Sequence, residues 1–67
     1  MTREAFGERI FQLRSKMGLS QAEFEDLCGL TQGYIAHIEL GHRNPSLQTL
    51  AKIAEGMDLS LAQLLDT

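Results

Sequence analysis

Residues 20–41 read SQAEFEDLCGLTQGYIAHIELG and contain the start and stop signals of two short helices. The first four residues form a capping box, in which the serine hydroxyl and the Glu23 carboxylate each accept a hydrogen bond from an otherwise unpaired backbone N–H. Gly29 is expected to end that helix, because glycine adopts the left-handed conformation of a helix terminus at little cost. Thr31 is expected to cap a second helix over about residues 32–39, which the final glycine ends.

The same kinds of signal predict three further helices on either side of this stretch. Apolar residues at three- and four-residue spacing indicate a first helix over residues 3–17, with Gly18 after it. Ser46 is expected to cap a fourth helix that Gly56 stops, and Ser60 opens a short fifth helix with a second capping box. No stretch of the sequence alternates apolar and polar residues as a strand does. The sequence therefore predicts an all-α fold of five helices.

Each predicted helix has an apolar face that we expect to be buried. The expected inward residues are Phe6, Ile10, Leu13 and Met17 on the first helix, Phe24, Leu27 and Cys28 on the second, Tyr34, Ile35 and Ile38 on the third, and Leu47, Leu50, Ala51, Ile53 and Ala54 on the fourth. The single cysteine is expected to be a small buried apolar residue, because it has no second cysteine with which to form an intramolecular disulfide. A chain of 67 residues supports one hydrophobic core, so residues 1–67 are interpreted as a single domain.

Composition and motifs exclude several classes of protein. No apolar run approaches the roughly 18 residues of a membrane span, and charges interrupt the N-terminal segment, so we expect a soluble, cytoplasmic protein without a membrane partner. We find no catalytic acid–base pair and no phosphate-binding glycine loop, and the core has little room to enclose a small-molecule substrate. The spacing of His37, Glu39 and His42 does not place three metal ligands on one helical face. We therefore predict no enzyme, no catalytic residue, no metal and no cofactor.

The net charge of −3 argues weakly against nucleic acid until it is divided along the chain. Residues 1–18 carry +2 and residues 40–56 carry +1, whereas residues 19–39 carry −4 and residues 57–67 carry −2. A surface that binds an anion must therefore combine the first segment with the neighbourhood of Arg43.

The second and third predicted helices are separated by Gly29-Leu30-Thr31, which has the length and glycine placement of a helix-turn-helix. Helices joined so closely cross steeply, and the outer face of the second one can enter the major groove of DNA. On that face Gln32 can pair with an adenine edge, Gly33 allows close approach, and His37 can reach a base or a phosphate. Gln32 could instead be a solvated residue of the first helical turn, but its place on the projecting face favours a base contact. For His37, a solvated surface residue fits the sequence equally well.

These motifs make the chain similar to the Cro/CI-type, or Xre-like, helix-turn-helix repressors and restriction–modification controller proteins. The resemblance covers nearly the whole chain and is carried by Gly18-Leu19-Ser20-Gln21, Gly29-Leu30-Thr31, Tyr34-Ile35, Ile38-Glu39, Gly41, Asn44-Pro45-Ser46-Leu47 and Thr49-Leu50. It implies a compact, lambda-repressor-like five-helix bundle. It also implies sequence-specific binding of a pseudo-palindromic DNA operator by a homodimer, with the third helix in the major groove and transcription as the regulated process.

The resemblance also implies roles for individual residues. Gln32, Gly33 and His37 would face bases, and Gln21 would brace Gln32. The expected phosphate contacts are Gln21, Arg43 and Asn44.

The last predicted helix carries Leu61, Leu64 and Leu65, more apolar residues than one short helix needs in order to dock. They fit either the core of the chain itself or a two-fold dimer interface. In such a dimer, the two DNA-reading helices would lie about 34–36 Å apart, one turn of DNA. The alternative functions are a protein–protein interaction module on the same fold and the N-terminal DNA-binding domain of a longer regulator.

Three residues depart from the family pattern. Glu25 stands where a small residue, commonly alanine, packs near the turn, and we expect its carboxylate to extend to a basic partner such as Arg14 or Lys16. Replacing Glu25 with alanine is then expected to raise the melting temperature. Gly33 is expected to weaken the third helix by about 1 kcal/mol relative to alanine. Leu40 stands where arginine or another polar residue is common.

Overall fold

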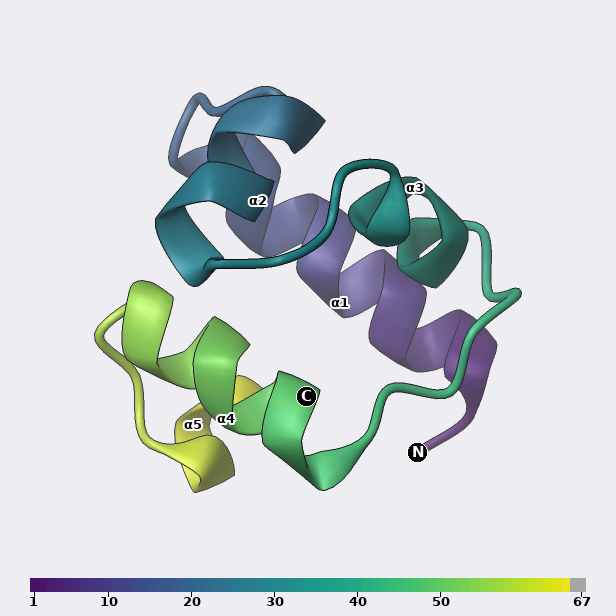
Figure 1. Ribbon diagram of the computed structural model, residues 1–67. Coiled ribbons are helices and arrows are strands. Elements are labelled where there is room, and N and C mark those ends of the chain that lie inside the picture. Colours follow the sequence, from purple (N-terminus) through teal and green to yellow (C-terminus); the bar gives the residue numbers. More distant parts are fainter. Residues whose placement is uncertain (66–67) are drawn as a thin grey trace.

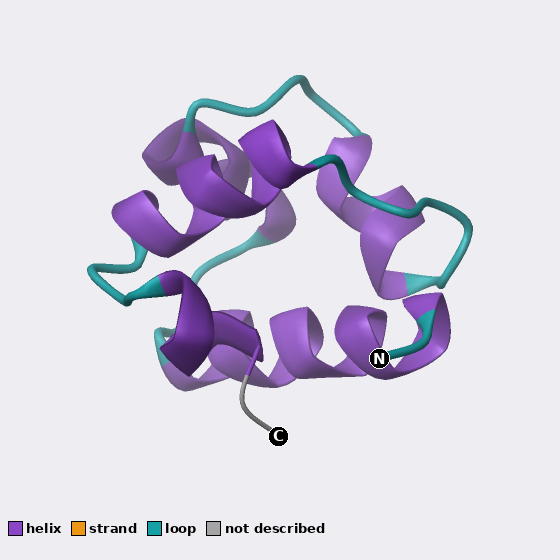
Figure 2. Cartoon of the chain, turned by 90° about the horizontal axis from the view of Figure 1, so that it is seen from below, coloured by secondary structure: helices purple, strands orange, loops and turns teal. Residues whose placement is uncertain are grey.

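The computed structural model describes residues 1–65, which form five α-helices joined by short turns (Figure 1; Figure 2). The helices are α1 (Arg3–Lys16), α2 (Gln21–Cys28), α3 (Tyr34–Glu39), α4 (Leu47–Gly56) and α5 (Leu61–Leu65). Residues 66–67, including Asp66, lie outside the described part. Residues 1–65 contain no strand, so the predicted all-α fold is confirmed. No helix within residues 1–65 is both long enough and apolar enough to cross a membrane.

Local capping explains where four of these helices begin. In each, the hydroxyl of the residue before the helix accepts a hydrogen bond from the backbone N–H three residues later, at 3.0–3.2 Å. The four capping residues are Thr2, Ser20, Ser46 and Ser60. The two predicted capping boxes are complete, because the side chains of Glu23 and Gln63 each accept the backbone N–H of their serine at 2.8 Å.

The third helix departs from the prediction, because it begins at Tyr34 rather than near residue 32. The Thr31 carbonyl accepts the Tyr34 N–H at 3.1 Å and closes a turn in which Gly33 has a φ of +86°. That conformation strains a residue with a side chain but not glycine. The expectation that Gly33 weakens the helix is therefore wrong, since Gly33 precedes the helix in a conformation that glycine favours.

Gly56 ends α4 as predicted, because it is the last residue of that helix, and the positive φ after it falls on Asp58. A Cβ at Gly56 would lie 2.8 Å from the Sγ and 3.0 Å from the Cα of Cys28. The missing side chain thus lets α4 approach the backbone of α2 closely.

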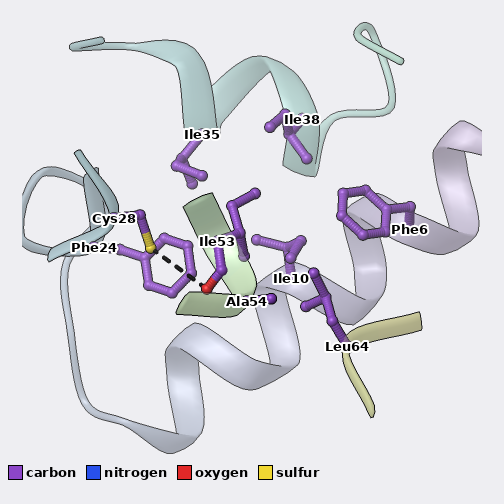
Figure 3. Packing of buried hydrophobic residues seen from close by; sticks show 9 residues of the cluster. All are labelled: Phe6, Ile10, Phe24, Cys28, Ile35, Ile38, Ile53, Ala54 and Leu64. Carbon is purple, nitrogen blue, oxygen red and sulfur yellow. Dashed lines mark hydrogen bonds between the residues drawn. The ribbon is translucent and has the colours of Figure 1, made fainter. Parts of the chain in front are cut away.

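The hydrophobic core lies between the helices, and all five contribute side chains to it (Figure 3). Its buried members are Phe6, Ile10, Phe24, Cys28, Ile35, Ile38, Ile53, Ala54 and Leu64. Contacts join α3 to α1 and α2, α2 to α4, and α4 to α5. Burial raises the pKa of the Cys28 thiol to about 11, so this cysteine is neutral and unreactive at ordinary pH.

Four residues expected in the core are exposed instead, namely Met17, Leu27, Leu47 and Ala51. Met17 follows the last residue of α1, and Leu47 is the first residue of α4, so each lies at a helix end. On α2 the buried arc includes Glu25 as well as Phe24 and Cys28, which leaves Leu27 on the outer side.

Candidate nucleic-acid interface

The connection between α2 and α3, which we call the α2–α3 turn, comprises residues 29–33. It is two residues longer than predicted because α3 begins later than expected. Gly29 starts the turn in the left-handed conformation, and the Leu30 N–H donates to the Glu25 carbonyl at 2.9 Å. Gln32 and Gly33 are exposed and lie on this turn rather than on the helix. The turn, and not the helix, therefore positions two of the three residues that were expected to face bases.

An open groove of about 520 Å³ runs beside this turn. We call it the turn groove, and its lining consists of residues 29–33 with Tyr34, His37, Arg43, Thr49 and Lys52. The structure thus brings all three expected base-facing residues together with one of the expected phosphate contacts. Residues from α3, from α4 and from both flanking loops contribute to it.

Two cations line the turn groove. The Arg43 guanidinium carbon lies 5.4 Å from the centre of the Tyr34 ring, a distance at which the cation is attracted to the ring face. Lys52 on α4 is the second cation, and it was missed as a site residue. The sequence signal for Lys52 was the positive charge of residues 40–56, which did not show that α4 would face the turn.

The two other expected phosphate contacts lie outside the turn groove. Gln21 is exposed at the start of α2, and its Nε2 donates to Glu39 Oε1 at 3.0 Å. In the unbound chain this amide donates to the far end of α3 and not to Gln32, so the bracing of Gln32 by Gln21 stays a prediction for the DNA-bound chain. Asn44 is exposed and lines a separate hollow near the start of α1.

Glu39 joins the C-terminal end of α3 to α1. Its Oε2 accepts from Arg14 Nε at 2.6 Å and its Oε1 accepts from Arg14 Nη2 at 3.0 Å. Arg14 also donates to the Leu19 carbonyl at 2.9 Å. The hydrogen bond to Glu39 raises the pKa of Arg14 above its ordinary value. Because both side chains are largely withdrawn from water, this ion pair fixes one end of α3 firmly.

Glu25 does not reach a basic partner, and that prediction is wrong. Its side chain is buried, and its Oε2 accepts the backbone N–H of Ile35 at 3.0 Å. Arg14, one of the expected cations, is engaged by Glu39. The start of α3 offers an unpaired N–H directly above α2, so the carboxylate is satisfied without crossing to the surface.

Fewer of the cations in residues 1–18 are available to bind an anion than the sequence suggests. Arg14 is bound to Glu39, and Arg9 donates to the carbonyls of Leu64 and Gln63 at 3.2 and 3.0 Å. Arg9 therefore fastens the end of α5 to α1. Two of the four cations in residues 1–18 thus serve the fold itself.

The two histidines, His37 on α3 and His42 in the following loop, are exposed. The centres of their rings lie 6.2 Å apart. Among residues 1–65 no group of His, Cys, Asp or Glu could hold a metal ion.

The three leucines of α5 do not share one environment. Leu64 is fully buried in the core of the chain, so its predicted place in a dimer interface is wrong. Leu61 is partly buried against the core, and Leu65 is 38% exposed. Leu65 lines the same hollow as Asn44, together with the exposed Met1.

Comparison with known proteins matches residues 10–64 to the family described as helix-turn-helix. An HTH-type transcriptional regulator of Sinorhizobium fredii is 36% identical over 62 residues, which cover 92% of this chain and 80% of that protein. The control protein C.BamHI of Bacillus amyloliquefaciens is 39% identical over 62 residues, which cover 91% of this chain and 76% of that protein.

Among solved structures, the restriction-modification controller protein C.AhdI of Aeromonas hydrophila has a TM-score of 0.86 at 36% identity. The superposition covers 94% of this chain and 91% of that chain. The family match spans most of the chain, and the fold and sequence comparisons agree with it. The chain belongs to the Xre-like helix-turn-helix family of DNA-binding transcriptional regulators.

Proposed function

We propose that this chain regulates transcription by reading a pseudo-palindromic DNA operator as a homodimer, with α3 and the α2–α3 turn in the major groove. One observation carries the proposal: the turn groove joins exposed Gln32, Gly33 and His37 to two cations, Arg43 and Lys52. Polar groups that read bases and cations that hold phosphates are the two parts of a specific DNA interface.

The base contacts come from the turn and the first part of α3. The Gln32 amide can donate to and accept from an adenine edge at the same time. Gly33, without a side chain, lets the backbone approach the base pairs closely. His37 lies further along α3 and reaches a neighbouring base or phosphate.

The phosphate contacts come from the rim of the turn groove and from flanking loops. Arg43 is oriented by the Tyr34 ring, and Lys52 adds a second positive charge from α4. Gln21 and Asn44 are the proposed outer contacts. Because Arg9 and Arg14 are committed to internal hydrogen bonds, few cations remain for phosphates. The affinity for DNA should therefore depend only shallowly on salt concentration.

A second copy of the chain is proposed to pack against the last helix. Leu65 is exposed and Leu61 is partly exposed, so both can contribute to a two-fold interface, whereas Leu64 belongs to the core. A two-fold dimer presents two α3 helices to successive major grooves about 34–36 Å apart.

Selection from a random duplex pool, followed by fluorescence anisotropy across a salt series, tests the proposal. We expect enrichment of two inverted half-sites centred about 10 base pairs apart. The selected duplex should bind at least about a thousandfold more tightly than random DNA. If no sequence is enriched and no duplex exceeds the random level, the operator proposal fails.

Matched variants separate base contacts from phosphate contacts. Gln32→Ala should cost about 1–3 kcal/mol on the selected duplex and relax the preference at one base position. Arg43→Ala and Lys52→Ala should weaken all duplexes alike and each reduce the salt slope by about 1. Lys16→Ala is the control, because Lys16 is exposed but does not line the turn groove.

A protein-interaction role on the same fold has one observation in its favour. Leu40 is 67% exposed, and it lines a hollow of about 360 Å³ with the exposed Phe11. Leu40→Arg distinguishes the two roles: under the DNA proposal the added cation tightens binding to every duplex, whereas a protein-binding surface gives no such gain.

A further inference from the structure

We propose that Glu25 is a positioning residue for DNA reading, because its buried carboxylate supplies the helix cap that α3 lacks. This inference rests on the proposed function, since it concerns how the turn that carries Gln32 and Gly33 is held. It also explains why a glutamate at position 25, where the family commonly has alanine, can serve the helix-turn-helix itself.

The start of α3 has no cap of its own. The first backbone N–H groups of any helix have no partner within the helix. The helices α1, α2 and α4 each begin with a hydroxyl that accepts one of these N–H groups, and so does α5 through Ser60. The residue before α3 is Gly33, which has no side chain and makes no side-chain cap.

Glu25 supplies the missing acceptor from the neighbouring helix. Its Oε2 accepts the N–H of Ile35, the second residue of α3, at 3.0 Å. A negative charge is favoured at a helix N-terminus, where the backbone N–H groups point outward. The side chain is 4% exposed, so water competes little for this hydrogen bond.

The same residue also fixes the other end of the α2–α3 turn. The backbone carbonyl of Glu25 accepts the N–H of Leu30 at 2.9 Å, just after α2 ends. One residue therefore anchors the turn where it leaves α2 and where it enters α3. Gln32 and Gly33 lie between these two anchors.

This arrangement predicts that base reading and phosphate binding respond differently to a change at position 25. Base contacts need a fixed geometry, and they come from the turn and α3 that Glu25 holds. The hydrogen bonds of Glu25 go to Ile35 and Leu30, and none goes to Arg43 in its loop or to Lys52 on α4. Loss of the cap should therefore reduce binding to the preferred sequence while leaving binding to random DNA intact.

The charge of Glu25 is an alternative cause that a control must separate. Removing any negative charge near the interface favours all duplexes alike. Asp26 is the neighbouring residue on α2 and is exposed, so Asp26→Asn removes one charge without touching the cap.

The test compares Glu25→Met, Glu25→Gln, Asp26→Asn and the unchanged chain. Methionine matches the length of glutamate but lacks the acceptor, whereas glutamine keeps an acceptor oxygen. For each protein, affinity for the selected duplex and for random duplex is measured well below the melting temperature, together with hydrogen exchange at the Ile35 amide.

We expect Glu25→Met to lower the ratio of selected to random affinity by about tenfold, the size of one lost base contact. Its affinity for random DNA should stay within about twofold of the unchanged chain, and Ile35 should lose protection from exchange. Glu25→Gln and Asp26→Asn should keep the ratio. An unchanged ratio in Glu25→Met, or an equal loss in Glu25→Gln, would overturn the inference.

The two proposals fail in different ways. If the unchanged chain prefers no sequence, the proposed function fails, and the cap is then judged by exchange alone. Loss of Ile35 protection in Glu25→Met supports the cap in that case, and retained protection overturns it.

Discussion

The two helices of the helix-turn-helix are stabilised in opposite ways. Helix α2 begins with a capping box made from its own residues, Ser20 and Glu23, and ends at a left-handed glycine. Helix α3 has no cap from the residue before it and is held by its neighbours: Glu25 of α2 binds its N-terminal end, and Arg14 of α1 binds its C-terminal end through Glu39. The helix proposed to read DNA is thus positioned by tertiary contacts, while the helix beside it is encoded locally.

The largest effect is expected at the C-terminal anchor of α3. Arg14→Met leaves the Glu39 carboxylate, 7% exposed, without its cation. Removing one partner of a largely buried pair costs about 3 kcal/mol. Urea unfolding should show this loss, whereas Lys16→Met, at an exposed site two residues away, should stay within about 0.5 kcal/mol. Equal losses in both variants would contradict the tertiary anchoring of α3.

The N-terminal anchor should give the next largest effect. Glu25→Ala leaves the buried Ile35 N–H unpaired, which costs about 1–3 kcal/mol. The melting temperature should therefore fall, in contrast to the rise expected from the sequence. Thermal unfolding followed by circular dichroism measures the change, and a higher melting temperature would show that the carboxylate contributes nothing as a cap.

The turn between the anchors should tolerate side chains poorly. Gly33→Ala places a Cβ at a φ of +86° and should cost about 1–2 kcal/mol. Asparagine adopts positive φ more readily, so Gly33→Asn should lose less. Chemical denaturation of the two variants tests this order, and a stabilised alanine variant would contradict the observed turn.

The local cap of α2 should give the smallest effect, and it should depend on pH. Hydrogen bonding to the Ser20 backbone N–H lowers the pKa of Glu23 below its ordinary value. A carboxylate with a lowered folded-state pKa contributes stability above its unfolded-state pKa, and this contribution is lost as pH falls through the folded-state pKa. In acid titrations of unfolding, Glu23→Gln should show a slightly weaker loss than the unchanged chain. A titration curve unchanged by the substitution would argue against an ionised cap.

The difference between α2 and α3 also explains what could be predicted from the sequence. Caps and glycine stops act within a few residues, so the starts of α2, α4 and α5 followed directly from Ser20, Ser46 and Ser60. The start of α3 could not be placed, because the acceptor that pins it comes ten residues earlier in the chain. The burial of Glu25 in place of Leu27 could not be predicted for the same reason, because Glu25 is buried where its carboxylate binds the Ile35 N–H of a different helix.

The candidate site was predictable in part for the same reason. Spacing after Gly29 identified Gln32, Gly33 and His37, which the structure gathers in one groove. The direction of a long side chain depends on distant neighbours, so the internal partners of Gln21, Arg9 and Arg14 were not foreseeable. Lys52 lines the turn groove because α4 packs beside the α2–α3 turn. No local sequence pattern indicates this packing.

The account is tested most directly by an NMR titration of the isotope-labelled chain with the selected duplex. We expect the largest amide shifts in residues 31–37 and at Arg43 and Asn44, with small shifts around Ala62 on α5. Largest shifts around Glu8 and Phe11 on α1, or no concentration of shifts in the turn groove, would contradict DNA reading by α3.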